Sequence, residues 1–239
     1  MSKSRYALAA MAMLVPSAAH AAPGLGDEVY GAEVEKGELE FEAIYSALAG
    51  GPEDGEDALV LEGAYGLTDS FRLGLRGEFE KEPGEDRELE ALGIEGIYEL
   101  GKVGGLTFAL YGEYEIVFDG ADKIETKLLV QRKAGPLDLR FNLIAEKELE
   151  SGEKVELEYA VSADVEAFGE VRLGVQAYGE LGTFDDFLPR AEHFVGPVAK
   201  FEIEGLGPEL EIEAGYLFAL GEANDETNGQ FRLLVELEF

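Results

Sequence analysis

The stretch Gln230–Phe239, QFRLLVELEF, decides the fold of this chain. Apolar side chains occupy every second position, at Phe231, Leu233, Val235, Leu237 and Phe239. The positions between them hold Arg232, Glu236 and Glu238, with Leu234 as the one apolar exception. Successive side chains of a β-strand point to opposite faces of the sheet, so this period of two predicts a strand with one apolar and one polar face.

Eleven earlier stretches show the same alternation. The first covers residues 38–47, and the clearest covers residues 106–118, whose alternate positions are Leu, Phe, Leu, Gly, Tyr, Ile and Phe. Each stretch has roughly 9–12 residues, the length of a strand that crosses a bilayer at the tilt of a barrel. The pattern predicts twelve strands, an even number as in bacterial transmembrane barrels. Pro197 lies in the tenth stretch and has no N–H to donate, so we expect a bulge at Gly196–Pro197.

The connections between these stretches alternate in length. Joins after even-numbered strands are short, as in LTDS at residues 67–70, and most joins after odd-numbered strands are longer and acidic, as in GGPEDGED at residues 50–57. Short turns at one end and longer loops at the other are typical of transmembrane barrels, with the short turns in the periplasm. We therefore expect an all-β fold, a twelve-stranded antiparallel up-and-down transmembrane β-barrel.

A terminal strand that ends on Phe239 resembles the closing strand of Gram-negative outer-membrane β-barrels, which ends on an aromatic residue, usually Phe. The resemblance implies a location in the bacterial outer membrane, in contact with its lipid. It also implies recognition by the barrel-assembly machinery through the strand that ends at Phe239. Because the first and last strands of a barrel must pair, we expect Gln230–Phe239 to lie beside Glu38–Ala47.

The start of the chain has the pattern of a secretory signal peptide. Lys3 and Arg5 precede an apolar stretch from Tyr6 to Val15, and Ala19-His20-Ala21 matches the small-residue cleavage pattern. The apolar stretch is too short to span a bilayer, which takes roughly 20 residues. We expect three regions: 1–21 signal peptide, 22–36 N-terminal lead-in and 37–239 transmembrane β-barrel.

Composition restricts the function. The chain has 51 Asp and Glu against 19 Lys and Arg, and no Cys. Nucleic acid is excluded as a partner because phosphate binding requires a basic surface. Without Cys there are no disulfides, so burial and backbone hydrogen bonds must hold the fold. A hydrophobic content of 46% in regular alternation argues against a disordered acidic chain.

The two faces of the strands have different expected surroundings. The almost purely apolar face fits lipid contact, and the charged face fits a lumen. The predicted acidic lumen wall comprises Glu40, Glu62, Glu78, Glu113, Glu115, Glu156, Glu158, Glu202, Glu211, Glu213 and Glu236. The predicted basic residues on the same wall are Arg72, Arg76, Lys127, Arg140, Arg172, Lys200 and Arg232.

Two interpretations of this wall remain open. Carboxylates around a water-filled pore would favour the passage of cations. Alternatively, Arg and Lys pair with Glu across neighbouring strands and close the lumen, because a twelve-stranded barrel is only modestly wider than an eight-stranded one. The excess of acids favours the first interpretation, a channel for passive passage of small solutes with a weak preference for cations. The second is a closed structural barrel without transport.

Other activities find less support. The acidic outer loops could hold Ca²⁺, but a solvated rim is the more ordinary state of such loops. His193, in an expected outer loop, has no neighbouring Ser of the kind that an outer-membrane phospholipase needs. We therefore expect no catalytic residue, no metal site and no cofactor.

The stretch AYGLTDSFRLGLRGEFE, residues 64–80, resembles a repeated hairpin phrase of the outer-membrane transporter family associated with the meta-pathway of phenol degradation. The preceding VEKGELEFEAIY, residues 34–45, resembles the opening strand of such barrels. Both stretches lie within residues 34–80, about a fifth of the chain. The resemblance implies a channel for small solutes, including hydrophobic compounds.

Overall fold

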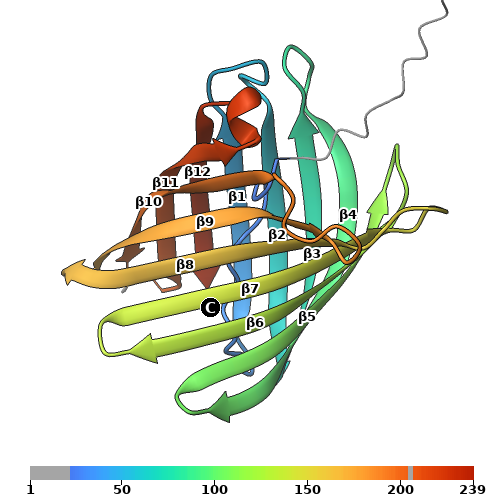
Figure 1. Ribbon diagram of the computed structural model, residues 1–239. Coiled ribbons are helices and arrows are strands. Elements are labelled where there is room, and N and C mark those ends of the chain that lie inside the picture. The colour runs from blue at the N-terminus through green and yellow to red at the C-terminus, as the bar shows by residue number, and fades with distance from the viewer. Residues whose placement is uncertain (1–21, 204–206) are drawn as a thin grey trace, which may run out of the picture.

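Strand β1 (Leu39–Leu48) pairs with strand β12 (Gly229–Glu238), and this pairing closes a barrel. The computed structural model describes residues 22–203 and 207–239. Within them, each of the remaining strands is hydrogen-bonded antiparallel to the strands that precede and follow it in the sequence (Figure 1). The predicted signal peptide lies outside the described residues. The remaining strands are β2 (Asp57–Thr68), β3 (Phe71–Lys81), β4 (Glu88–Val103), β5 (Leu106–Val117), β6 (Lys123–Ala134), β7 (Leu137–Glu148), β8 (Glu156–Phe168), β9 (Val171–Thr183), β10 (Glu192–Ile203) and β11 (Glu209–Gly221).

The predicted fold is confirmed: the described part of the chain is all-β, with twelve antiparallel strands in a closed barrel. The expected closing pair is also present, since Phe41 lies opposite Leu237 and Ala47 opposite Phe231. One short 3₁₀ helix, η1 (Ala223–Asp225), interrupts the last loop. Among the described residues no helix is long and apolar enough to cross a membrane.

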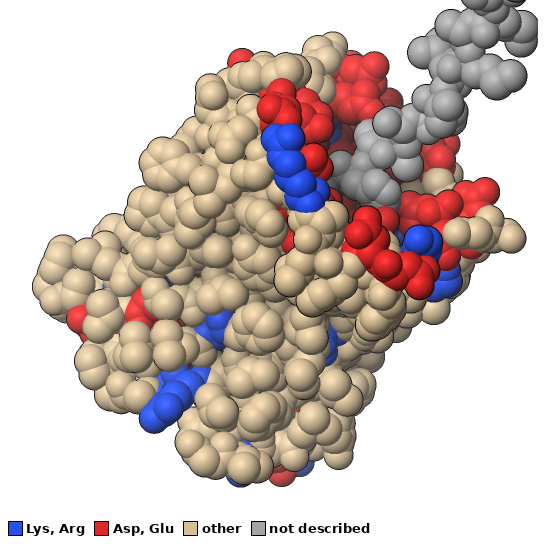
Figure 2. Space-filling view, viewed as in Figure 1, with Lys and Arg blue, Asp and Glu red and all other residues tan. Residues whose placement is uncertain are grey.

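The barrel has two ends, which we call the turn end and the loop end. The turn end carries the short joins β2–β3, β4–β5, β6–β7 and β8–β9, and with them the start of β1 and the end of β12. The loop end carries the joins after the odd-numbered strands. Figure 2 shows Asp and Glu gathered around the loop end, while the barrel side that faces the viewer is mostly tan.

The outward face of the strands is apolar, as the alternation predicts. Large side chains such as Leu75, Ile94 and Phe118 are exposed on the outside. The polar set points inward, where Glu42, Glu113 and Lys127 are buried. This polarity is the reverse of that of a soluble barrel, and only a lipid environment would shield such an outer surface from water.

Apolar residues at polar positions have local explanations. Leu234, Ile44 and Val60 lie in one cross-strand row on β12, β1 and β2 and form a small inward cluster. In β4 the register shifts between the pairs of Glu78 and Phe79, so Leu89 faces outward although Ile97 faces inward. This bulge explains the outward position of Leu89. Ile97 keeps the inward parity of the rest of the strand and belongs to the buried cluster that contains Tyr30 and Ala32.

The predicted bulge at Gly196–Pro197 is wrong. Val195 pairs with Phe218 and Val198 with Gly215, so β10 and β11 keep one register across the proline. The pairing of β10 with β9 continues through Pro197 opposite Val175. A Cβ at Gly196 would lie 2.0 Å from the carbonyl oxygen of Tyr216, so a glycine there lets the two strands stay close. The missing donor of Pro197 is therefore accommodated without an extra residue.

Candidate functional site

Residues 22–36, here called the lumen segment, run through the inside of the barrel. Ala22 and Leu25 pack at the loop end against Leu48, Ala58 and other residues of one buried cluster. Further along, Tyr30 and Ala32 pack against residues of β4, β5 and β6. The segment then reaches the turn end, where Gly37 donates a backbone hydrogen bond to Gly66. The N-terminal lead-in expected from the sequence, residues 22–36, therefore lies inside the barrel and fills its lumen.

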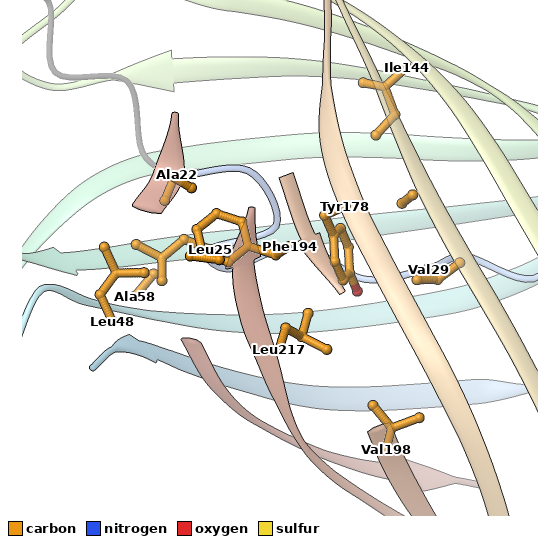
Figure 3. Packing of buried hydrophobic residues seen from close by; sticks show 13 residues of the cluster. Ala22, Leu25, Val29, Leu48, Ala58, Ile144, Tyr178, Phe194, Val198 and Leu217 are labelled. Atoms are coloured by element: carbon orange, nitrogen blue, oxygen red, sulfur yellow. The ribbon is translucent and has the colours of Figure 1, made fainter. Parts of the chain in front are cut away.

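Apolar contacts hold the loop-end part of the lumen segment. Figure 3 shows Ala22, Leu25 and Val29 among Tyr178, Phe194, Leu217 and their neighbours from the barrel wall. Gly24 lies directly against the ring of Tyr178, and a Cβ there would be 2.5 Å from the ring. The barrel wall here presents apolar side chains to the lumen, and the lumen segment covers them.

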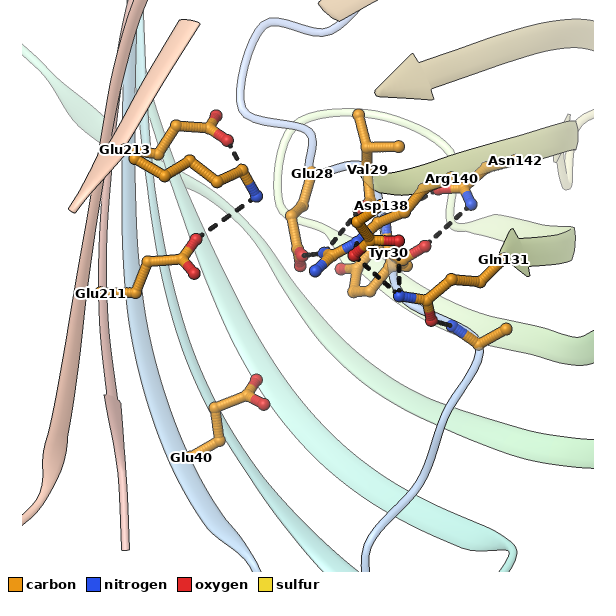
Figure 4. A network of polar contacts seen from close by, with 12 residues as sticks. Glu28, Val29, Tyr30, Glu40, Gln131, Asp138, Arg140, Asn142, Glu211 and Glu213 are labelled. Carbon is orange, nitrogen blue, oxygen red and sulfur yellow. Dashed lines mark hydrogen bonds and ion pairs between the residues drawn. The ribbon is translucent and has the colours of Figure 1, made fainter. Parts of the chain in front are cut away.

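Side-chain amides replace a partner strand for the middle of the lumen segment. Asn142 of β7 accepts a hydrogen bond from the N–H of Tyr30 (2.8 Å) and donates one to its carbonyl oxygen (3.0 Å). Gln131 of β6 accepts from the N–H of Ala32 (2.9 Å) and donates to Asp138 (Figure 4). Buried backbone groups need such partners, so these amides fix the path of the lumen segment.

Cationic side chains tie the lumen segment at both ends. Arg232 of β12 donates to the carbonyl oxygens of Gly24 and Asp27, and its guanidinium lies 4.4 Å from the ring of Tyr178. At the turn end, Lys102 and Lys133 contact Glu33 at 2.6 and 2.9 Å. These two ammonium groups lower the pKa of Glu33 to about 2.

Between the two ends of the barrel, in a region here called the waist, two tyrosines of the lumen lie among carboxylates. The rings of Tyr30 and Tyr111 lie 4.9 Å apart, and the ammonium of Lys127 lies 4.7 and 4.8 Å from them. The Tyr30 hydroxyl is 3.3 Å from both Glu62 and Glu95. The Tyr111 hydroxyl is 2.9 Å from Glu95 and 2.6 Å from Glu113. A continuous polar chain therefore joins the lumen segment to β2, β4 and β5.

Six of the seven predicted basic residues form ion pairs on the inner wall. Arg72 contacts Glu40 and Glu62, Arg76 contacts Glu78 and Glu113, and Lys200 contacts Glu211 and Glu213. Lys127 contacts Glu125, Arg140 contacts Asp138, and Arg172 contacts Asp164. Arg232 instead holds the lumen segment. The predicted acids Glu115, Glu156 and Glu158 line a cavity at the loop end, and Glu202 and Glu236 line cavities at the turn end.

Several residues of the site were not among the predicted wall residues. Glu95 is 2% exposed and lies between the two tyrosines. Because it follows the outward-facing Ile94 in the strand, the alternation alone could have predicted that it faces the lumen. Asn142, Gln131 and Asp138 also share the inward parity of their strands. For Asp27, Glu28 and Tyr30 the sequence offered no signal, because the lumen segment has no strand periodicity.

Two cavities lie on either side of the waist. The loop-end cavity has a volume of about 390 Å³, and fourteen of its lining residues are Asp or Glu against two that are Arg or Lys. The turn-end cavity has a volume of about 500 Å³, with ten acidic and six basic lining residues. The inner wall is therefore uneven in charge: strongly acidic at the loop end and mixed at the turn end.

Two weaker candidate sites are also placed by the structure. His193 lies in β10, not in a loop as expected, and its Nδ1 is 3.3 Å from the hydroxyl of Tyr159. Ser162 is buried on the inner wall. Glu38, Glu40 and Glu238 bring carboxylate oxygens within 4.8 Å of one another at the turn end, but both oxygens of Glu40 already contact Arg72.

The fold is similar to that of solved outer-membrane barrels. The KdgM porin, in a complex with oligogalacturonate, superposes with a TM-score of 0.56 at 8% identity, over 84% of this chain and 98% of that one. The NanC porin gives 0.56 at 9% identity, over 84% and 98%. An outer membrane channel from Pseudomonas putida F1 gives 0.57 at 11% identity, over 92% and 100%. No protein-family model and no curated protein matches the sequence.

The architecture and the apolar outer surface together establish the setting of the barrel. A closed antiparallel barrel with an apolar belt spans a membrane, since neither open strand edges nor charged surfaces are tolerated there. Its fold is that of the outer-membrane proteins above. The predicted location, the bacterial outer membrane in contact with lipid, is confirmed.

Proposed function

We propose that this protein is an outer-membrane channel for the passive passage of small solutes, with an acid-rich lumen that weakly prefers cations. The observation that carries the proposal is the pair of polar cavities, about 390 and 500 Å³, at the two ends of one lumen. A barrel whose only role was structural would not need polar, water-accessible space at both ends.

The preference for cations follows from the charge of the walls. The predicted basic residues are largely neutralised by ion pairs, as for Arg72 with Glu40 and Glu62. The excess carboxylates are concentrated at the loop end, which is the outer mouth when the short turns face the periplasm. Carboxylate rings attract positive charge and repel anions.

The closed structural barrel is the alternative, and the lumen segment favours it. Its hydrogen bonds to Asn142 and Gln131, and the contacts of Tyr30 with Tyr111 and Glu95, occupy the waist between the two cavities. The channel therefore requires either a narrow path beside the segment or its displacement. Small ions and water are the solutes that such a waist would admit.

Proteins that resemble this one in fold or in a short stretch of sequence suggest other solutes. The KdgM structure holds oligogalacturonate, an acidic sugar chain, which the carboxylates of this lumen would repel. The resemblance of residues 64–80 to the phenol-degradation transporter family implies hydrophobic compounds. Polar cavities suit small cations better than hydrophobic compounds. We also propose that the barrel-assembly machinery recognises the strand that ends at Phe239.

Single-channel recording in planar bilayers tests the proposed function. With a salt gradient across the bilayer, we expect a small conductance with a reversal potential of the sign that cation flow produces. Conductance at the background level would contradict the channel and favour the structural barrel. A reversal potential of the opposite sign would contradict the role of the lumen carboxylates.

A further inference from the structure

Residues 184–191, which join β9 to β10 and are here called the β9–β10 loop, carry a group of exposed apolar side chains. Phe184, Phe187 and Leu188 are 74, 58 and 64% exposed. They lie within five residues of one another, at the loop end of the barrel. Large apolar side chains gathered in one short exposed segment mark a surface that contacts another molecule or a membrane.

The β9–β10 loop has a defined conformation. The N–H of Thr183 donates to the carbonyl oxygen of Asp186 (2.9 Å), and the N–H of Leu188 donates to that of Leu181 (2.9 Å). Among the described residues, Leu188 is the one non-glycine residue with a positive φ, 58°. This backbone conformation is unfavourable for a residue with a Cβ, so the surrounding contacts must hold it. The loop therefore presents its apolar side chains from a fixed backbone.

The β9–β10 loop folds back over the outer wall of the barrel. Gly182 lies opposite Leu157 of β8, and a Cβ at Gly182 would be 2.6 Å from Cδ of Pro189. Leu157 lies opposite Ala145 of β7, two residues beyond Leu143 on the same outward face. Leu143 is 37% exposed but Leu157 only 8%, and we attribute this burial to the folded-back loop. Figure 1 shows the loop (orange) in front of the barrel wall near the start of β8.

A second contact places the loop beside the start of β8. Lys154, two residues before that strand, contacts Asp185 at 3.5 Å. The loop therefore lies at the loop-end edge of the lipid-facing wall, where the apolar core of a bilayer meets the headgroups. Aromatic side chains are enriched at this level in transmembrane barrels. The exposed Asp185 and Asp186 supply the polar groups that the water side of such a segment requires.

We propose that the β9–β10 loop is a membrane anchor, which inserts Phe184, Phe187 and Leu188 into the leaflet at the loop end. The occupant is lipid because the loop covers a position of the lipid-facing wall and continues that apolar surface beyond the strands. Transfer of exposed apolar side chains from water into acyl chains is favourable. The anchor goes beyond the proposed channel and does not depend on conduction.

Tryptophan fluorescence tests the anchor directly, because the chain has no Trp. The mature barrel with Phe187→Trp is placed in vesicles of dioleoyl phosphatidylcholine or of its analogue with brominated acyl chains, which quench indole on contact. We expect a severalfold loss of emission in the brominated vesicles and little quenching by acrylamide added to the water. The heat-dependent shift of gel mobility verifies folding, and Phe184→Trp replaces a Phe187→Trp variant that does not fold.

Two control variants bracket the result. Phe218→Trp replaces an outward side chain of β11 that is 55% exposed, and it should lose emission to the brominated lipid to a similar extent. Glu85→Trp, at an exposed position between β3 and β4, should be quenched by acrylamide instead. Phe187→Trp that behaves like Glu85→Trp would contradict the anchor, since the loop would then lie in water. Protection from both quenchers would also overturn it, because a second copy of the chain would then cover the loop.

Discussion

Single side chains on the inner wall decide whether the lumen segment stays in place. Asn142 is fully buried, and its one amide satisfies both backbone groups of Tyr30, 112 positions earlier in the chain. Its inward position follows from the alternation of β7. Its partner could not be predicted, because the contact joins a strand to a segment without periodicity. Glu95 shows the opposite case: it was not among the predicted wall residues, although its position beside the outward-facing Ile94 was a signal that could have placed it in the lumen.

Replacement of Asn142 by Ala should loosen the lumen segment. Two buried backbone groups of Tyr30 lose their partners, at a cost of about 2 to 4 kcal/mol for the docked segment. Hydrogen exchange of the amides around Tyr30 should become faster by a large factor, while the barrel strands keep their protection. Ser162→Ala is the control, because Ser162 is equally buried on the inner wall but its hydroxyl has no hydrogen-bond partner. Similar exchange in both variants would contradict the role of Asn142.

A pH dependence should follow from Glu33. Its pKa is lowered to about 2 by Lys102 and Lys133, so its stabilising effect on the docked segment is complete above its ordinary value of 4.5. This effect is lost as the pH falls from 4.5 through 2. Glu33→Gln should therefore reduce the protection of residues 32–35 at pH 6 and make little difference near pH 2. Glu35→Gln, at an exposed neighbouring position, is the control. A difference between parent and Glu33→Gln that is the same at both pH values would refute the ion-pair explanation.

At the scale of elements, the strands were predictable and the lumen segment was not. A period of two identified the twelve strands, their two faces and the closing pair of β1 and β12, because lipid on one side and polar groups on the other impose the alternation. The prediction for Pro197 was wrong because Gly196 allows close approach without a bulge. Residues 22–36 take their conformation from contacts with distant strands, which no local pattern encodes.

The closing strand should also govern assembly. Phe239 donates a backbone hydrogen bond to Leu39 (2.9 Å) and accepts one in return (3.2 Å), and its ring meets that of Phe41 at 6.3 Å. Deletion of Phe239 removes these contacts and the proposed assembly signal, so we expect the folded, heat-modifiable fraction in the outer membrane to fall severalfold. Phe118→Ala, which removes a similarly exposed aromatic at the loop end, should have a smaller effect. Equal effects would indicate that only membrane anchoring by aromatics matters.

For the whole molecule, the uneven charge and the occupied waist are linked. The loop-end cavity is lined mostly by acidic residues, the lumen segment separates it from the turn-end cavity, and the ion pairs of Arg72, Arg76 and Lys200 line the walls on both sides. The sequence predicted the inward charges but not their division between two ends. That division depends on where an unpatterned segment lies inside the barrel.

The central claim is that the lumen segment restricts passage between the two cavities. The most direct test compares single-channel conductance of the refolded mature barrel with that of a form that lacks residues 22–34, each verified as heat-modifiable. We predict a severalfold larger conductance for the shortened form, with a reversal potential that still shows cation preference. Equal conductance in the two forms would contradict the claim.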